Sequence, residues 1–497
     1  MSLDRIEDVE VLRDLVRVQL RESERLKTEL AAAYAELKGK KPAEAQQLAL
    51  RLEQIERQRD AALAQLFGPK SERRGKDKQP KPRTPQPGHG RKDQPALPLD
   101  EVLLELPEPE RVCDLCGKAM AEWSGECEES EEIDFEVPRV VMKRYRRQKY
   151  RCSCGGCIKT APAPRKLFAK ARYSVNFALQ IALQKYMNHM PLDRQCRDLR
   201  RLGLEVTTAT LWDYLWAQYE LLAPVMPRLH AHVLTKPVIG MDETPWKLLK
   251  SEKRGKSKKW WVWAQRADDA VYYHLDPSRG AKVVEQLLGD YAGTIIVDGY
   301  PTYSSVERSP DSKFQLANCW SHARREVLPF EKDPRGGRVL RVIQRMYRLE
   351  SAAKRRGLSP PELLQWRQRK TRPLLNALFR WIGNQEIPST HGLHAALTYI
   401  LKRETGLKRF LDEPLLSPDN NDTERALRGV VVGRKNHYGS RSERGTCVAA
   451  LFYSLLESAE LAGVNTREYL GAALHSAIDG EQIPLPHELA ERDSDEK

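Results

Sequence analysis

The sequence contains no hydrophobic run long enough to cross a membrane. Its 497 residues include no apolar stretch of about 18, and the first ten, MSLDRIEDVE, are acidic where a secretory signal would be basic and then apolar. We therefore expect neither a membrane partner nor export, and we place the protein in the cytoplasm.

Cysteine is scarce and unevenly placed. Nine is an odd number, and the clustering of these cysteines suits a reducing compartment with a metal site better than a disulfide framework. The sequence also lacks a convincing setting for a nucleophilic serine or tyrosine, which agrees with chemistry that forms no covalent protein intermediate.

Acidic residues are fewer than basic ones. The chain has 83 lysines and arginines against 69 aspartates and glutamates, a formal charge of +14 and a pI near 9.2. This excess makes a polyanionic partner plausible, and ordinary basic surface charge is the alternative. A chain of this length is expected to form about three domains.

Three carboxylates stand in settings typical of sheet edges and helix starts. Asp242 and Asp298 each follow a short β-branched apolar run and precede turn residues, so a sheet would present both at its edge. Glu424 precedes apolar residues at helical spacing, which predicts a place in the first turn of a helix. The capping side chains before it are Asp419, Asn420, Asn421 and Asp422.

Two strands and one helix could thus bring three acids to one point. Gathered acids repel one another unless a cation neutralises them, and hard oxygen ligands suit Mg²⁺ or Mn²⁺. Two such ions can activate a water or a 3′-hydroxyl and stabilise the leaving oxygen in phosphodiester chemistry. Spacing alone does not establish this, because most of the 69 acidic residues must be solvated surface charges.

Five motifs follow one another along the chain. They are MDETPW, VDGYPTY, NCWSHARRE, NDTERALRGVVVGRKN and YGSRSERG. This ordered set resembles the DDE transposases of bacterial insertion sequence family 66, over nearly the whole chain. The resemblance implies a ribonuclease-H-like domain with Asp242, Asp298 and Glu424 as its catalytic triad. It also implies accessory proteins encoded by the same element, although no residue indicates where they would dock.

Residues near these motifs are candidates for supporting roles. His322 could orient or protonate groups at the active site, or be a buried structural histidine. Arg324 and Arg325 could hold the scissile strand by bidentate phosphate contacts. Arg428, one turn beyond Glu424, could pair with that carboxylate or bind DNA.

The same motifs contain three further features. Arg434 and Lys435 form a second basic group that we assign to DNA. Glu243 should point away from Asp242, because successive side chains of a strand alternate between faces. Trp246 could stack on an unpaired base, but a place in the core is favoured.

A zinc site is expected in the segment before the helical region. Cys113 and Cys116 form one CxxC knuckle, and Cys154 and Cys157 form a second, so four thiolates could bind one structural Zn²⁺ tetrahedrally. Related family members more often have a single CxxC at the second knuckle. The additional Cys152 therefore leaves the fourth ligand open.

The N-terminal part has no catalytic content. Residues 1–67 show a leucine stripe broken at Lys41-Pro42, which predicts a coiled coil or helical hairpin that either pairs protomers or docks on its own chain. Residues 68–98 contain seven prolines and nine basic residues against three acidic ones. This composition predicts an extended linker that attracts phosphates or merely solubilises.

A helix, a turn at Gly203 and a capped helix have the proportions of a helix-turn-helix. The second helix would present its first residues to DNA, and the first would offer arginines to phosphates. A helical hairpin that binds nothing is the alternative. The candidate DNA-binding residues are Arg194, Arg197, Thr207, Thr208 and Thr210.

The remaining pattern predicts a mixed sheet with flanking helices. Strands are expected over Val238–Met241, Trp260–Gln265, Val271–Leu275, Thr294–Val297 and Phe314–Trp320, and helices over Ala281–Tyr291 and Cys447–Leu461. About 90 residues with helical periodicity separate Asp298 from Glu424. They predict an α-helical insertion that either grips DNA or only buttresses the domain. The acidic end, Glu488–Lys497, is expected to be disordered.

The fold class predicted is multidomain α+β. Its parts are a coiled-coil region (1–67), a basic linker (68–98), a zinc-binding domain (99–168), a helix-turn-helix (169–232), a ribonuclease-H-like, retroviral-integrase-like mixed α/β catalytic domain (233–445) with a helical insertion (about 321–416), and a C-terminal helical region with an acidic tail (446–497).

The function predicted is that of a transposase that cuts and joins DNA. It would bind the terminal inverted repeats and target DNA as a homodimer or higher oligomer, with two Mg²⁺ or Mn²⁺ ions at the triad. The alternatives are a DNA-binding protein of transposase descent that no longer cuts, and a ribonuclease-H-like nuclease.

Overall fold

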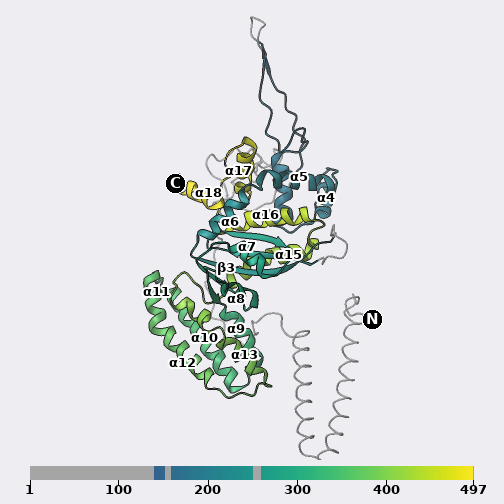
Figure 1. The fold of residues 1–497 in the computed structure, drawn as a ribbon. Coiled ribbons are helices and arrows are strands. Elements are labelled where there is room, and N and C mark those ends of the chain that lie inside the picture. The colour runs from purple at the N-terminus through teal and green to yellow at the C-terminus, as the bar shows by residue number, and fades with distance from the viewer. Residues whose placement is uncertain (1–138, 152–157, 250–258, 496–497) are drawn as a thin grey trace, which may run out of the picture. The chain divides into compact units, whose positions relative to one another are not determined.

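The computed structural model describes residues 139–151, 158–249 and 259–495. All of them belong to one compact unit, Glu132–Lys497 (Figure 1). The expected coiled coil, the linker and the zinc-binding cysteines lie outside the described residues, so these remain predictions. No helix within the described part is long and apolar enough to span a membrane.

A mixed five-stranded sheet forms the centre of the unit. Its strands stand in the order β5-β4-β3-β6-β7, with β3, β4 and β5 antiparallel to one another and β6 and β7 parallel to β3. The strands are β3 (Val238–Lys247), β4 (Lys259–Arg266), β5 (Val271–Asp276), β6 (Thr294–Val297) and β7 (Gln315–Asn318). A short separate ribbon pairs β1 (Lys149–Arg151) with β2 (Ile158–Thr160).

Strand β3 is longer than the sequence predicts. Its parallel pairing with β6 ends at Gly240, near the expected end at Met241, but its antiparallel pairing with β4 continues to Lys247. Asp242 therefore stands inside a strand and not after one. The aromatic side chains of β4 account for this extension, because they pair across β3 as far as Trp246.

Helices cover both faces of the sheet and one of its edges. Helix α15 (Asn421–His437) packs on β3 and β4, and α8 (Pro301–Glu307) approaches β3 from the opposite face. Helix α16 (Glu443–Leu461) runs along the edge strand β5, where Ser454 and Ser458 accept hydrogen bonds from the Tyr273 and Val271 amides at 2.8 and 2.9 Å. These hydroxyls satisfy backbone groups that an open edge would leave unpaired.

Within the residues that the structure describes, four helices precede the sheet, and α7 (Ala281–Leu288) lies between β5 and β6. The four are α3 (Val175–Tyr186), α4 (Leu192–Arg201), α5 (Thr208–Leu222) and α6 (Val225–Thr235). The predicted pair of helices around Gly203 is confirmed as secondary structure: α4 ends before Gly203, which has φ +83°, and Thr207 caps α5 by accepting from the Thr210 amide.

The segment between β7 and α15 is helical, as predicted, and it has a hydrophobic core of its own. Trp320, Ile343, Leu375 and Leu397 are among its buried side chains, and Ile296 and Ala317 of the sheet join them. Its elements are α9 (Trp320–Val327), η3 (Leu328–Phe330), α10 (Pro334–Arg355), α11 (Pro360–Trp366), η4 (Arg367–Thr371), α12 (Arg372–Gly383), α13 (Gly392–Leu401), α14 (Glu404–Lys408) and η5 (Arg409–Leu411).

The C-terminal end corrects one prediction. After α17 (Thr466–Asp479), residues Pro486–Asp495 form helix α18, so disorder is wrong as far as Asp495. Glu488 accepts from the Leu485 amide and from Arg228 of α6, both at 2.7 Å. The acidic composition suggested a solvated tail, but this acid caps a helix and pairs with a distant arginine.

Candidate active site

Asp242 and Asp298 lie just beyond the point where the parallel pairing of β3 and β6 ends. Gly240 of β3 pairs with Ile296 of β6, and each aspartate stands two residues beyond its strand's member of that pair. Parallel strands in register carry equivalent positions to the same level of the sheet. Two hydrogen bonds hold Asp298 in place. Its backbone carbonyl accepts from the Asn318 side chain at 3.4 Å, and its carboxylate accepts from the Tyr300 amide at 2.8 Å.

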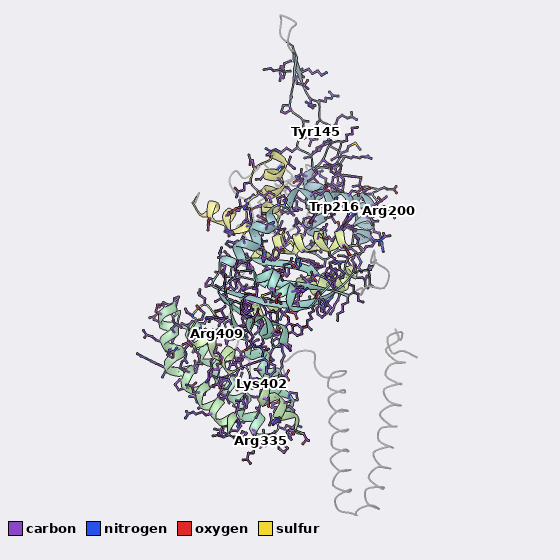
Figure 2. All side chains as sticks on the ribbon, viewed as in Figure 1. Tyr145, Arg200, Trp216, Arg335, Lys402 and Arg409 are labelled. Carbon is purple, nitrogen blue, oxygen red and sulfur yellow. The ribbon has the colours of Figure 1, made fainter. Side chains whose placement is uncertain are left out.

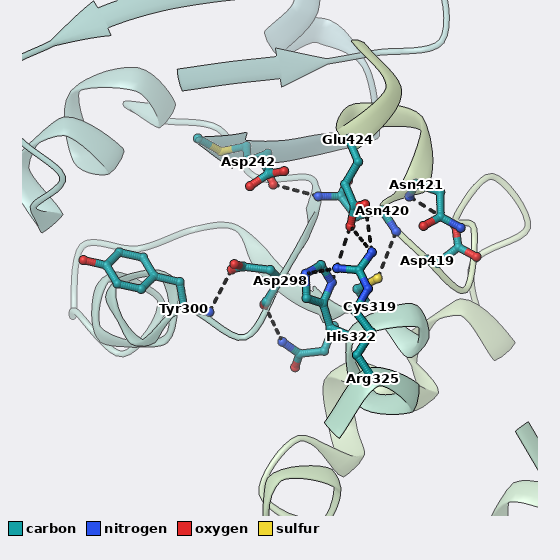
Figure 3. A network of polar contacts seen from close by, with 12 residues as sticks. Asp242, Asp298, Tyr300, Cys319, His322, Arg325, Asp419, Asn420, Asn421 and Glu424 are labelled. Carbon is teal, nitrogen blue, oxygen red and sulfur yellow. Dashed lines mark hydrogen bonds and ion pairs between the residues drawn. The ribbon is translucent and has the colours of Figure 1, made fainter. Parts of the chain in front are cut away.

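Glu424 reaches this end of the sheet because the first turn of α15 lies against β3. A Cβ on Gly240 would overlap Thr423 Oγ1 and would lie 2.7 Å from Asn420 Oδ1, so only glycine permits this approach. The buried Asn420 side chain donates to the Met241 carbonyl at 2.8 Å, and its backbone amide donates to Cys319 Sγ at 3.3 Å. Figure 3 shows the resulting group of acids around the junction.

The carboxyl group of Asp242 is destabilised in its charged form. Burial is the main cause, and the neighbouring charges of Glu243, Asp298 and Glu424 add to it, so that its pKa rises to about 7. A cation beside Asp242 would relieve this repulsion. We therefore expect a positive charge to be stabilising beside Asp242.

Glu424 has partners of its own on helix α9. Arg325 Nη2 donates to both oxygens of its carboxylate, at 2.9 and 3.2 Å, and His322 Nδ1 lies 3.7 Å from Glu424 Oε1. Arg325 Nη1 lies 3.0 Å from His322 Nε2, which must accept because a guanidinium only donates. The imidazole is therefore neutral with its proton on Nδ1. Burial first, and then Arg325, lowers the pKa of His322 and agrees with that form.

Arg428 does not pair with Glu424, although the sequence allowed that pairing. Its side chain is exposed, and the carboxylate is engaged by Arg325 instead. A helix places side chains four apart on one face, but Arg325 approaches from another element and reaches both carboxylate oxygens. The tertiary contact prevails because one guanidinium nitrogen, Arg325 Nη2, lies within hydrogen-bond distance of both oxygens.

The three acids do not form one tight cluster. Within the described ranges, His232, Asp269 and His487 are the group whose three ligand atoms all lie within 4.8 Å of one another. That group is poorly suited to a metal: the two imidazole rings stack 3.7 Å apart at 15°, so their lone pairs point in nearly parallel planes, and Lys236 already pairs with Asp269 at 2.6 Å. We interpret it as a contact that joins α6, the β4–β5 turn and α18.

The face of β3 opposite Asp242 carries a buried network. Glu243 points away from Asp242, as predicted, and accepts from Arg279 at 2.7 Å and from Tyr303 at 2.6 Å. Arg279 also stacks on Tyr300, 3.7 Å from the ring, and the Tyr300 amide binds Asp298. The network therefore braces both aspartates from behind. A glycine within a strand pattern signalled the contact at Gly240, but no local sequence pattern marked Arg279 or Tyr303.

The other predicted residues lie in several places. Arg194, Thr207 and Thr208 are exposed on or just before α4 and α5, Arg197 pairs with Asp193, and Thr210 is half-buried beside its cap. None of these contacts the acids.

On α15, Lys435 is exposed and Arg434 binds Thr244 and the Pro245 carbonyl of β3. Arg324 is half-buried on α9. Trp246 is a core residue that donates to Ser440 at 3.1 Å.

Comparison with known proteins gives consistent results. A family model described as the IS66 family of transposases matches residues 170–447. The uncharacterized protein y4jD of Sinorhizobium fredii is 30% identical over 406 residues, which cover 77% of this chain and 78% of that protein. Two more uncharacterized proteins of that organism, y4hP and y4qI, are 27% and 28% identical over 403 residues, covering 75% and 76% of this chain and 71% and 73% of their own. The family match runs from the start of the helical region to α16, across every strand of the mixed sheet, and the chain therefore belongs to the IS66 family of transposases.

Proposed function

We propose that the chain cuts and joins DNA strands as a DDE transposase with Asp242, Asp298 and Glu424 as its catalytic carboxylates. Membership of a transposase family implies an enzyme that acts on DNA. The observation that carries the finer assignment is the meeting of the first turn of α15 with β3 at the point where the parallel pairing of β3 and β6 ends. Asp242 and Asp298 share one register, and Gly240 and Asn420 fix the helix that carries Glu424 against the same strand.

The order and directions of the strands support a ribonuclease-H-like catalytic domain. Three consecutive antiparallel strands are followed by two strands that join the first in parallel. This topology makes β3 central and places the end of β6 beside it, so that one acid comes from each. The long helical insertion then separates the second acid from the third.

The donor set fits Mg²⁺ or Mn²⁺. Asp242 is a half-buried carboxylate among other carboxylates, and the rise of its pKa to about 7 agrees with a site that would gain from positive charge. Asp242 and Asp298 would hold two divalent cations from the strands, and Glu424 would complete the set from α15. When bound, such ions stabilise the attacking and leaving oxygens of a phosphodiester exchange.

The chain's own groups have distinct tasks in this proposal. Asp242 releases its proton near neutral pH before it can act as a ligand. Arg325 fixes Glu424 through both carboxylate oxygens, and the neutral His322 aligns Arg325 by accepting from it. His322 acts as an orienting group, because the Nε2 lone pair that would take up a proton is already occupied. Arg324 and Arg428 would contact the scissile strand.

Recognition of the element's ends is assigned to regions apart from the acids. The exposed starts of α4 and α5 would bind the terminal inverted repeats, with Arg194, Thr207 and Thr208 toward the DNA. One structural Zn²⁺ on Cys113, Cys116, Cys154 and Cys157, with Cys152 as a possible substitute, would stabilise the preceding domain. Assembly as a homodimer or higher oligomer would bring two ends together.

The test is cleavage and joining of labelled duplexes that carry the DNA flanking the gene, incubated with Mg²⁺ and a supercoiled target plasmid. The native protein should cut and join, whereas Asp242→Asn, Asp298→Asn and Glu424→Gln should bind the duplex without doing either. Asp412→Asn removes an exposed carboxylate from the insertion and is the matched control.

Three outcomes would contradict the proposal. Cleavage that survives Glu424→Gln would remove that residue from the triad. Cutting without joining would indicate a nuclease. Binding without cutting, with cell extract supplied, would indicate a DNA-binding protein of transposase descent.

A further inference from the structure

Helix α10 has one buried face and one strongly basic face. Its buried side includes Val339, Ile343, Met346 and Ala353, which pack into or beside the core of the helical insertion. Five arginines follow at intervals of three, four, three and seven residues, which places them on the side of the helix opposite that core. This α10 arginine face consists of Arg338, Arg341, Arg345, Arg348 and Arg355, all exposed.

The α10 arginine face is nearly free of acidic partners. Within the described residues, no carboxylate forms an ion pair with any of its five members, and Arg338 instead lies 4.5 Å over the Trp381 ring. The single acid of α10 is Glu350, which pairs with the buried Arg367 at 2.8 Å. No acid among the described residues therefore compensates the positive charge on this face.

Helix α4 provides the contrast. It also exposes arginines, but Arg197 pairs with Asp193 and Arg201 lies 3.7 Å from Asp198 within the same helix. Such pairs are worth little to stability, yet they satisfy part of the local charge. On the α10 arginine face, by contrast, none of the five arginines has such a pair within its own helix, because the one acid of α10 is engaged by Arg367.

The α10 arginine face belongs to the same compact unit as the acids. Helix α9, which carries His322 and Arg325, packs on α10, and Trp320 at its start enters the core of the insertion. In Figure 2, Arg335 marks the first turn of α10 at the far end of the insertion, and Arg200 marks α4 in a different part of the unit. A ligand on α10 would therefore be positioned relative to the catalytic sheet by packed helices.

The geometry points to the backbone of duplex DNA as the ligand of the α10 arginine face, a role that rests on the proposed function and adds a second DNA contact to it. From Arg338 to Arg355 the face is about 26 Å long at 1.5 Å rise per residue. A duplex carries one charge per about 1.7 Å of axis, so several phosphates fall within this length. The contact is independent of base sequence, since guanidinium groups on phosphates read charge and not base edges.

Chemistry favours DNA over an acidic protein partner. Protein interfaces depend on buried apolar or aromatic anchors, and none of the large hydrophobic residues exposed in the described unit belongs to α10. On the α10 arginine face, small or polar side chains such as Gln344 and Ala352 lie between the arginines. That composition offers charge without an apolar centre.

The experiment measures binding of the full chain to a fluorescent duplex of about 30 base pairs with arbitrary sequence, by anisotropy in increasing KCl without divalent metal. The test variant carries Arg341→Gln, Arg345→Gln and Arg348→Gln. The control carries Arg165→Gln, Arg335→Gln and Arg372→Gln, which lowers the charge equally but removes arginines that pair with Asp479, Asp333 and Asp412. A triple lysine variant at 341, 345 and 348 retains the charge.

The slope of log affinity against log salt should fall by about 0.9 for each lost phosphate contact, hence by about 2 to 3 in the test variant. Affinity at low salt should fall on the order of 10- to 100-fold. The control should change the slope by less than one contact, and the lysine variant should keep most of it. Equal slopes for the test and control variants would overturn the inference, as would an unchanged DNA slope combined with loss of binding to poly-L-glutamate.

Failure of this inference and failure of the proposed function give different results. Asp242→Asn should bind the duplex with the native salt slope, because that residue does not contribute to the α10 arginine face. If the native protein cuts and joins DNA but the test variant keeps its slope, only the α10 assignment is lost. If the test variant loses slope but the native protein never cuts, only the catalytic proposal is lost.

Discussion

The candidate site has two halves that differ in how their charge is balanced. The strand-borne half, Asp242 and Asp298, is positioned by backbone register and braced from behind by the Glu243–Arg279 network. The helix-borne half, Glu424, arrives from α15 and carries its own counterion in Arg325. Among the described residues, Asp242 and Asp298 therefore form no ion pair, whereas Glu424 is neutralised by Arg325.

This difference shows where a divalent cation would have the largest effect. The charged form of Asp242 is disfavoured by burial and by three neighbouring carboxylates, so a cation gained there relieves repulsion. At Glu424 a cation would compete with the Arg325 guanidinium, whose Nη2 contacts both carboxylate oxygens. Changes in the strand-borne half should therefore abolish activity, whereas changes around Glu424 should weaken it in proportion to how far its carboxylate moves.

The largest effect is expected from neutralising the strand-borne half. Asp242→Asn and Asp298→Asn should each lower the rate of DNA cleavage by about 10³-fold or more, because a lost carboxylate removes several kcal/mol of transition-state stabilisation. Single-turnover cleavage of a labelled duplex measures this. Duplex binding by anisotropy should be unchanged, and a loss of binding equal to the loss of rate would contradict the assignment.

The next largest effect is expected at the junction between the halves. A Cβ on Gly240 overlaps Thr423, so Gly240→Ala should displace the first turn of α15, lower cleavage by about 10²-fold and destabilise the fold by about 1–3 kcal/mol. Gly429→Ala is the matched control within α15, where the nearest atom would be His189 Cε1 at 3.8 Å. It should stabilise by up to about 1 kcal/mol. Equal behaviour of the two variants in urea unfolding and cleavage would contradict this account of the junction.

A smaller effect is expected from the counterion of the helix-borne half. Arg325→Gln should reduce cleavage by about 10-fold, because Glu424 stays on the same helix but loses two charge-assisted hydrogen bonds. His322→Asn should cost less, since it removes only the group that aligns Arg325. If the two residues act through one carboxylate, the double variant should lose less cleavage rate than the product of the two single losses. Cleavage rates of the three variants measure this.

The smallest effect is a shift in stability that has opposite signs in the two halves. The pKa of Asp242 is raised to about 7 in the folded chain. Its contribution to the stability of the fold is therefore fully present below about pH 4, is lost as the pH rises through 7, and is absent at pH 8. In EDTA at pH 8, Asp242→Asn should raise the melting temperature by a few degrees. Glu424→Gln should lower it slightly, because the ion pair with Arg325 is lost.

Metal and pH provide the checks on that stability shift. Adding Mn²⁺ at pH 8 should raise the melting temperature of the native protein, because an ion that binds the folded state stabilises it. It should not raise that of Asp242→Asn, which lacks the carboxylate that would bind the ion. As the pH is lowered from 8 to 4, the difference in melting temperature between the native protein and Asp242→Asn should shrink, because Asp242 becomes protonated first in the folded chain and then, near its ordinary pKa, in the unfolded chain. A native protein that melts higher than Asp242→Asn in EDTA at pH 8 would contradict the raised pKa.

Secondary structure was largely readable from local patterns. The five strands, the helical segment between Asp298 and Glu424, and the turn at Gly203 all follow from apolar periodicity and from Gly or Thr at helix ends. Errors occurred where partners are distant in sequence. The extension of β3 to Lys247 depends on pairing with β4, and helix α18 depends on Arg228, which a composition-based expectation of disorder does not include.

The sequence by itself determined that Asp298 follows a strand and that Glu424 lies in the first turn of a helix, because β-branched runs, turn residues and capping side chains act over a few neighbouring residues. Only the tertiary structure decided how those acids are balanced. Arg325 reaches Glu424, Arg279 braces Glu243 and Gly240 admits α15 through contacts between elements that are far apart in the chain. Charge compensation and close backbone approach depend on distances in space, and local patterning does not encode those distances.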